Sequence, residues 1–138
     1  LSTRLTAAEA ERKENEAVFN KIGQLPKNLS GAEFLPAITS NVFLQKLMQE
    51  ILAAEQKIIE LSNKYGNKHP KMIRAKNNLN ILKHKKALEI KKIIESEKNK
   101  HELLKAKEEN LRALFLENKI YSLNRNASFN MWMWIIIN

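Results

Sequence analysis

Cysteine is absent from this chain of 138 residues, and glycine and proline are rare, with three of each. Without cysteine, neither a disulfide scaffold nor a thiolate zinc site can form, and the redox compartment is not indicated. Four of the six breakers lie between Gly23 and Pro36, and the other two are Gly66 and Pro70. Long stretches without a breaker remain on both sides of Gly66, and strand-like runs are almost absent. The composition therefore predicts an all-α chain of long helices.

Long apolar runs are also missing. The longest, residues 131–137, is far shorter than the roughly 18 residues that a membrane-spanning helix needs. The chain begins at Leu1, and we expect it to be a piece of a longer protein. Missing targeting signals therefore say little about localisation.

The clearest periodic pattern predicts a helix from about Val42 to Tyr65. Apolar or aromatic residues recur there at alternating spacings of three and four, which is typical of a coiled coil. These seam positions are Leu44, Leu47, Ile51, Ala54, Ile58, Leu61 and Tyr65. Ser40 or Asn41 can cap the start of this helix. The apolar face extends further at Met48, Leu52 and Ile59. A face this wide indicates more than one packing partner.

Residues 65–70, Tyr-Gly-Asn-Lys-His-Pro, predict a tight bend. Gly66 can take the left-handed conformation that ends a helix, and Pro70 suits the first turn of the next one. A helix stop followed so soon by a helix start predicts an antiparallel helical hairpin. In that hairpin we expect Leu61 near Ile73. The further expected pairs are Ile58 near Leu79, and Leu44 near Ile90 to Ile93.

No breaker interrupts the chain after Pro70, so the last helix is predicted to reach Tyr121 or Asn126. Its apolar positions are Ile73, Leu79, Leu82, Ile90, Ile93, Leu104, Leu111, Leu114 and Phe115. Lys86, Glu97 and Lys100 dilute this seam, which is typical of a long, partly solvated coiled coil. A helix of this length needs a packed stripe to be stable.

Upstream of the hairpin, residues 1–22 predict a helix whose apolar stripe is weak at Arg12 and Asn15. We expect it to run alongside residues 104–115. We expect residues 23–40 to form an ordered connector, in which Phe34, Leu35 and Ile38 pack down on a neighbour. The predicted organisation is an N-terminal helix (1–22), a connector (23–40), a coiled-coil hairpin (41–128) with its bend at 65–70, and an apolar tail (129–138). The predicted fold is elongated.

The net charge of +9 comes from 24 basic and 15 acidic residues. One interpretation is a basic face that meets phosphates or an acidic polymer. The other is a solvated helix surface in a chain rich in residues with A/T-rich codons. From residue 64 to 107 there are thirteen Lys and one Arg against four Glu. The single Arg and the lack of aromatic residues from 67 to 113 argue against base recognition or base stacking.

Nothing in the sequence predicts catalysis. The three histidines are far apart and lack metal-ligand spacing. We expect His69 to be a loop or capping residue, and His84 and His101 to be solvated. No glycine-rich phosphate loop exists, and no motif places a base beside a serine. We therefore predict a non-enzyme without a catalytic, cofactor or metal site.

The bend carries a resemblance. Residues 35–41, Leu-Pro-Ala-Ile-Thr-Ser-Asn, lead into a helix that ends in a turn written Leu-Ser-x-x-Tyr-Gly-x-x-His-Pro. The turn residues are Leu61, Ser62, Tyr65, Gly66, His69 and Pro70. This pattern resembles bacterial polysaccharide chain-length regulators, the exopolysaccharide-transport or polysaccharide co-polymerase family. Residues 4–11 and the run Leu123-Asn124-Arg125 followed by Ala127 are also similar, so the resemblance covers residues 1–128. It departs at Val42, where the family often has proline, and after Phe129.

The resemblance implies a periplasmic coiled-coil arm between two inner-membrane spans that lie outside this segment. It also implies a homo-oligomer that acts with a polysaccharide polymerase or export machinery. From the residues themselves we expect no nucleic-acid partner and no cofactor. A basic coiled-coil scaffold that binds nucleic acid or a helical protein is the alternative.

Three interpretations of the tail, residues 129–138, stay open. It is a strand or membrane-interface segment carrying Trp132 and Trp134, a piece of core, or a non-native ending produced by truncation or a shifted reading frame. The third is favoured because the resemblance stops there.

Overall fold

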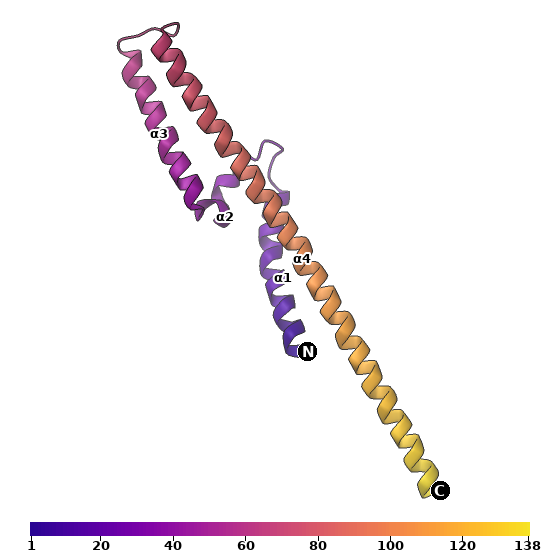
Figure 1. The fold of residues 1–138 in the computed structure, drawn as a ribbon. Coiled ribbons are helices and arrows are strands. Elements are labelled where there is room, and N and C mark those ends of the chain that lie inside the picture. Colours follow the sequence, from indigo (N-terminus) through magenta and orange to yellow (C-terminus); the bar gives the residue numbers. More distant parts are fainter. The chain divides into compact units, whose positions relative to one another are not determined.

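The computed structural model describes residues 1–138, and its regular elements are all helical (Figure 1). They are α1 (Ser2–Gly23), the 3-10 helix η1 (Ala32–Phe34), α2 (Pro36–Thr39), α3 (Val42–Ser62) and α4 (Pro70–Ile137). The predicted all-α fold is confirmed. The chain divides into two units: the hairpin unit, Asn20–Glu97, and the terminal unit, Leu1–Phe19 with Lys98–Asn138.

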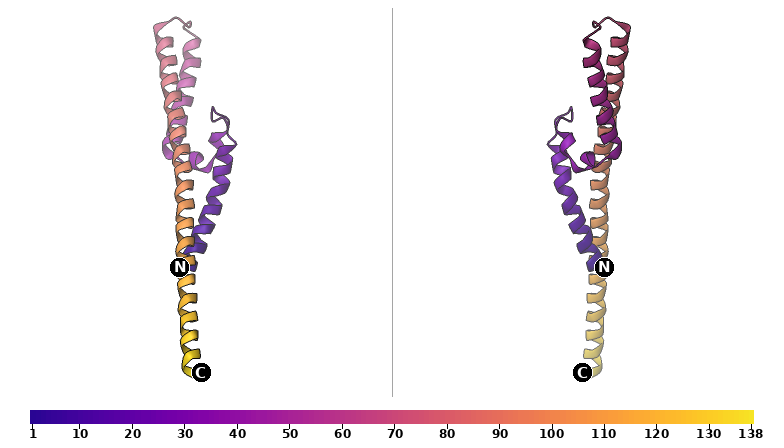
Figure 2. Two further views of the ribbon diagram at one scale, coloured as in Figure 1. Left: turned by 90° about the vertical axis from the view of Figure 1, so that its right-hand side faces the viewer. Right: turned by 90° about the vertical axis from the view of Figure 1, so that its left-hand side faces the viewer.

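In the hairpin unit, α3 lies antiparallel beside the first part of α4, and both views of Figure 2 show the two helices side by side. The side chain of Asn41 caps α3 by accepting a hydrogen bond of 2.9 Å from the N–H of Leu44. The buried apolar positions are Leu44, Leu47, Ile51 and Ala54 on α3, and Met72, Leu82, Ile90 and Ile94 on α4. The predicted coiled-coil hairpin is therefore held by an apolar seam.

The pairing between the two helices follows from an ion pair. Lys83 Nζ lies 4.0 Å from a carboxylate oxygen of Glu55. Because both helices advance by about 1.5 Å per residue, this pair brings Ile58 opposite Asn80, one residue from the predicted partner Leu79.

The predicted position of Ile73 in the seam is wrong. Ile73 is 46% exposed, whereas its neighbour Met72 is 1% exposed. Consecutive helical residues point about 100° apart, so only one member of an adjacent apolar pair can face the partner. Two further seam positions change: Ile94, at 2% exposure, is buried more deeply than the expected Ile93, and Leu114 is half exposed.

The connector is ordered, as predicted, and packs within the hairpin unit. Leu35 and Ile38 are buried, but Phe34 is 85% exposed, so the prediction that Phe34 packs down is wrong. The short turn of η1 directs Ala32 inward instead, with 0% exposure. Leu35 is extended, as the residue before proline should be. An ion pair of 3.7 Å between Glu33 and Lys86 ties the connector to α4.

In the terminal unit, α1 runs antiparallel along the middle of α4. Phe19 stacks on His101, Arg12 pairs with Glu108, and a carboxylate oxygen of Glu11 lies 3.8 Å from the Nζ of Lys107. Phe19, near the end of α1, meets an earlier residue of α4 than Arg12 does, so the two helices run in opposite directions. The predicted location of the N-terminal helix beside residues 104–115 is therefore confirmed.

Helix α4 continues well beyond its predicted end at Tyr121 or Asn126. It stays helical to Ile137, and residues 116–138 are all exposed. No glycine or proline follows Pro70, so nothing in the backbone chemistry stops the helix. The strand interpretation of the tail is therefore wrong. No helix of the chain has the length and apolar character needed to cross a membrane.

The adjacent pair Met72 and Ile73 tests the register of the hairpin. We expect Met72→Ala to lower the free energy of unfolding by about 2–5 kcal/mol, because it opens a cavity in the seam. Ile73→Ala should change it by less than about 1 kcal/mol. Urea unfolding followed by circular dichroism measures both. A larger loss in Ile73→Ala than in Met72→Ala would contradict this register.

Candidate functional site: the hairpin tip

The six residues of the turn motif all lie at the reversal between α3 and α4, which we call the hairpin tip (residues 61–76). Ser62 is the last residue of α3, and its Oγ donates a hydrogen bond of 2.6 Å to the carbonyl of Ile59. The half-buried Leu61 accepts backbone N–H bonds from Lys64 at 3.0 Å and from Tyr65 at 2.8 Å. These bonds satisfy the last carbonyls of α3. The helix therefore ends at Ser62, before the predicted Tyr65.

Gly66 does not take the left-handed conformation that its sequence position predicted. Only Gly31 and Leu29 have positive φ, at 88° and 58°. The reason is that α3 has already ended through the bonds to Leu61, so no left-handed residue is needed at position 66. The carbonyl of Gly66 instead accepts the N–H of His69 at 3.1 Å and closes the next turn.

His69 and Pro70 start α4. The Nδ1 of His69 accepts a hydrogen bond of 3.1 Å from the N–H of Lys71, and the carbonyl of His69 accepts the N–H of Ile73 at 3.0 Å. Pro70 is the first helical residue, where its missing N–H costs nothing. His69 is therefore a capping residue, as predicted.

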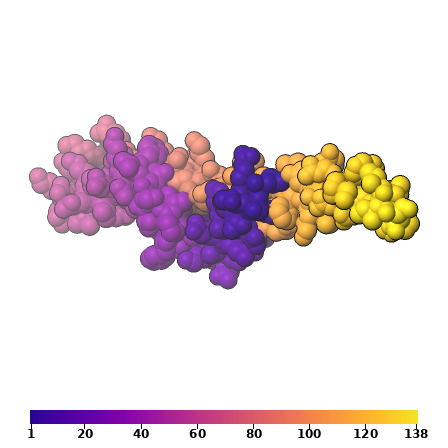
Figure 3. Space-filling model, turned by 90° about the horizontal axis from the view of Figure 1, so that it is seen from below, coloured from indigo at the N-terminus to yellow at the C-terminus, as the bar shows by residue number.

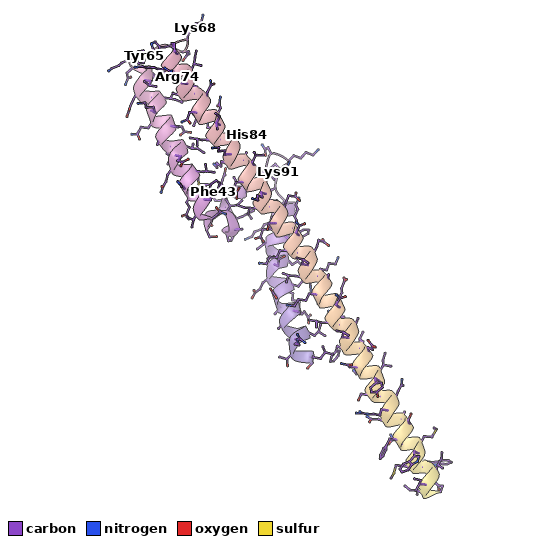
Figure 4. The ribbon with its side chains drawn as sticks, in the orientation of Figure 1. Phe43, Tyr65, Lys68, Arg74, His84 and Lys91 are labelled. Carbon is purple, nitrogen blue, oxygen red and sulfur yellow. The ribbon has the colours of Figure 1, made fainter.

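Tyr65 lies at the tip (Figure 4), and its ring has two close neighbours. The ring of His69 stacks on it with centroids 4.0 Å apart and an interplanar angle of 29°. The Nζ of Lys71 lies 5.4 Å from the ring centroid and 3.5 Å from the phenol oxygen. A cation near an aromatic face is attracted by the ring quadrupole. Three of the tip side chains thus form one cluster that fixes the turn.

The charge of the tip is not neutralised by carboxylates. No Asp or Glu occurs from residue 61 to residue 88. The basic side chains of the tip are Lys64, Lys68, Lys71, Arg74 and Lys76. Those that make hydrogen bonds use neutral oxygens: Lys71 reaches the phenol of Tyr65, and Lys76 donates to the amide of Asn67 at 3.0 Å. Such a surface attracts anions, and the attraction weakens as salt rises.

A second polar cluster lies between α1 and α4 in the terminal unit. The carboxylate of Glu108, only 3% exposed, accepts hydrogen bonds from Arg12 and, at 2.7 Å, from Arg112. Arg12 also donates to Glu16 at 2.9 Å. The pKa of Arg12 is raised above its ordinary value, mainly by the hydrogen bond to Glu108, against the opposing effect of burial. Arg12 therefore stays charged through the whole ordinary pH range.

His101 is buried next to this cluster, so the prediction that it is solvated is wrong. It is 9% exposed and stacks on Phe19 with centroids 3.8 Å apart and an interplanar angle of 7°. The reason is its place on α4, three residues before the buried Leu104 and so on the same face. His84, in contrast, is exposed, as predicted.

Sequence analysis missed the role of Glu108. The weak points that it noted in the stripe of α1, Arg12 and Asn15, are seam positions, since they continue the spacing from Leu5 and Ala8. A search for an acidic residue at a seam position of α4 would have found Glu108, four residues after Leu104.

No three histidine or carboxylate side chains come close enough together to hold a metal ion. No protein-family model, curated protein or solved structure matches this chain. The arrangement at the tip is therefore interpreted from its own chemistry, which is that of a rigid, cationic turn.

The neighbours Glu108 and Glu109 test the polar cluster. We expect Glu108→Gln to lower the melting temperature by several degrees, because the buried side chain loses the negative charge that Arg12 and Arg112 both contact. Glu109 is exposed, so Glu109→Gln should leave the melting temperature nearly unchanged. Thermal unfolding followed by circular dichroism compares the two variants. Equal effects would show that Glu108 has no special role.

Proposed function

We propose that this chain is a non-catalytic coiled-coil arm of a bacterial polysaccharide chain-length regulator, placed on the periplasmic side of the inner membrane. The observation that carries the proposal is the turn Leu-Ser-x-x-Tyr-Gly-x-x-His-Pro. Each of its six named residues lies at the reversal of a helical hairpin, which is the place that the resemblance gives to them.

The tip supports a structural or binding role. The imidazole of His69 is engaged in capping and stacking, and the hydroxyl of Ser62 is bonded to a backbone carbonyl. Neither side chain is poised as a base or nucleophile, because each needs its partner to hold the turn.

The mechanism in this proposal is mechanical. Residues 70–97 of α4 alone extend for about 40 Å at 1.5 Å per residue, and α3 braces them along an apolar seam. Such a hairpin is a spacer of defined length. Copies arranged around a polymerase or export complex would then set how far a growing polysaccharide extends before release. The exposed Leu52 and Ile59 on α3 offer apolar contacts to a second copy.

One observation favours a second function, a basic scaffold for nucleic acid. Residues 61–88 carry seven lysines and one arginine and no acidic residue. Against it, Tyr65 is the one aromatic residue other than His69 at the tip, and stacking on His69 already occupies one face of its ring.

Deletion of the gene in its source organism tests the main proposal. We expect the length distribution of surface polysaccharide to broaden or shift, as measured by gel electrophoresis of the extracted polymer. The gene restored with Tyr65→Ala and His69→Ala together should complement poorly, because the turn loses its cap and its stacked cluster. His84→Ala, which replaces an exposed histidine of α4 away from the turn, should complement fully. An unchanged distribution after deletion would refute the proposal.

Binding to duplex DNA separates the two functions. The scaffold function requires tight binding that falls steeply with salt concentration, and that replacement of Lys64, Lys68, Lys71 and Lys76 by glutamine abolishes. Under the main proposal we expect only weak binding. Mobility shifts over a series of salt concentrations provide the measurement.

A further inference from the structure

The last turns of α4 expose an apolar surface that nothing in the terminal unit covers. From residue 129 to 137 only Asn130 is polar, and the other side chains are 36% to 73% exposed. Figure 3 shows these residues, in yellow, with their surface uncovered in that view. Exposed apolar patches of this kind usually mark an interaction surface.

The distribution of the apolar side chains around the helix indicates what covers them. Nine consecutive residues make about two and a half helical turns, so with one polar residue among them every side of the helix is apolar. A helical partner covers one stripe and leaves the others in water. A helix that is apolar on all sides is matched by a medium that surrounds it, such as a protein core or lipid.

Length and charge favour lipid. Residues 129–137 extend for about 13 Å, less than half of the 30 Å hydrocarbon layer, so this segment suits the interfacial region of one leaflet and not a span. No charged residue occurs from position 126 to 138, in a chain that is 28% charged overall. Lys119 and Arg125 precede this uncharged stretch and can meet anionic headgroups. Trp132 and Trp134 are the residue type that bilayer interfaces favour.

We propose that residues 129–137 insert into one leaflet of a lipid bilayer and hold this end of α4 at the membrane surface. The inference rests on the apolar surface of this segment and not on the turn motif. It therefore stands or falls separately from the proposed polysaccharide function.

Tryptophan fluorescence tests this directly, because Trp132 and Trp134 are the only tryptophans in the chain. The full chain is titrated with unilamellar vesicles of phosphatidylcholine and phosphatidylglycerol. We expect the emission to shift to shorter wavelength, and lipids with brominated acyl chains to quench it. Flotation of the protein with the vesicles gives an independent measure of binding.

Matched variants locate the binding surface. Ile135→Gln with Ile136→Gln should weaken vesicle partitioning by at least about tenfold per substitution, since each removes a buried aliphatic side chain. Neither change adds a charge, and both sites are exposed, so the fold should persist by circular dichroism. Val42→Gln with Phe43→Gln, at similarly exposed positions on α3, should leave partitioning unchanged.

Two results would overturn the proposal. A blue shift that appears without vesicles and grows with protein concentration would show that a second copy covers the segment. Equal losses of partitioning in the α3 and α4 variants would show non-specific adsorption.

Discussion

The packed stripe of α4 is the constraint on which the structure depends. A helix of 68 residues is not stable in water through backbone propensity alone, and it needs one face covered. Within the hairpin unit α3 packs on α4, and within the terminal unit α1 packs on α4. The buried and half-buried positions of the stripe are Met72, Ala75, Leu79, Leu82, Lys86, Ile90, Ile94, Glu97, His101, Leu104, Glu108, Leu111 and Phe115. Their spacing alternates between three and four except from Leu82 to Ile94, where three steps of four follow one another. On a straight α-helix, positions seven residues apart rotate around the helix axis by about 20° per repeat. The third step of four adds one residue to the pattern, and this residue offsets the accumulated rotation.

The two parts of the stripe are built from different chemistry. The hairpin unit fills its seam with leucine, isoleucine and methionine, whose burial is the main source of stability. The terminal unit places Arg12 and Asn15 opposite Glu108 and its neighbours, so it buries fewer apolar groups. A buried ion pair contributes little net stability compared with an apolar pair. The ion pair does disfavour other alignments of the two helices. Any shift of α1 along α4 would separate Arg12 from the buried carboxylate of Glu108 and leave only Arg112 as its partner. We interpret the cluster as a device that sets the register of α1.

Much of the fold could be predicted from the sequence, because glycine, proline and heptad spacing act locally. Asn41, Pro70 and His69 behave as their positions predict, since capping depends on neighbours in the chain. Most errors concern which side chains are buried, because burial depends on residues that are distant along the chain. Whether Met72 or Ile73 faces the seam depends on how α3 is rotated, and both are apolar. His101 is polar but is buried, because Phe19 comes to lie beside it. The prediction that Gly66 is left-handed was wrong for a local reason, because hydrogen bonds to the carbonyl of Leu61 end the helix before position 66.

The distribution of charge distinguishes the shaft of the hairpin from its tip. Away from the tip, Lys83 and Lys86 form ion pairs with Glu55 and Glu33. Their positive charges are therefore partly balanced within the hairpin unit. At the tip, the lysines meet only neutral oxygens, and their charge remains available to an anionic partner. The sequence shows the excess of lysine, but it does not show which lysines are neutralised, because Glu33 and Glu55 are distant along the chain. The contrast matters for function, because an interaction made by the tip must weaken with salt. Contact through the uncharged residues 129–137 depends mainly on apolar burial, and only Lys119 and Arg125 add a salt-sensitive attraction, so salt should weaken it much less. Salt dependence therefore identifies which of the two surfaces makes a given interaction.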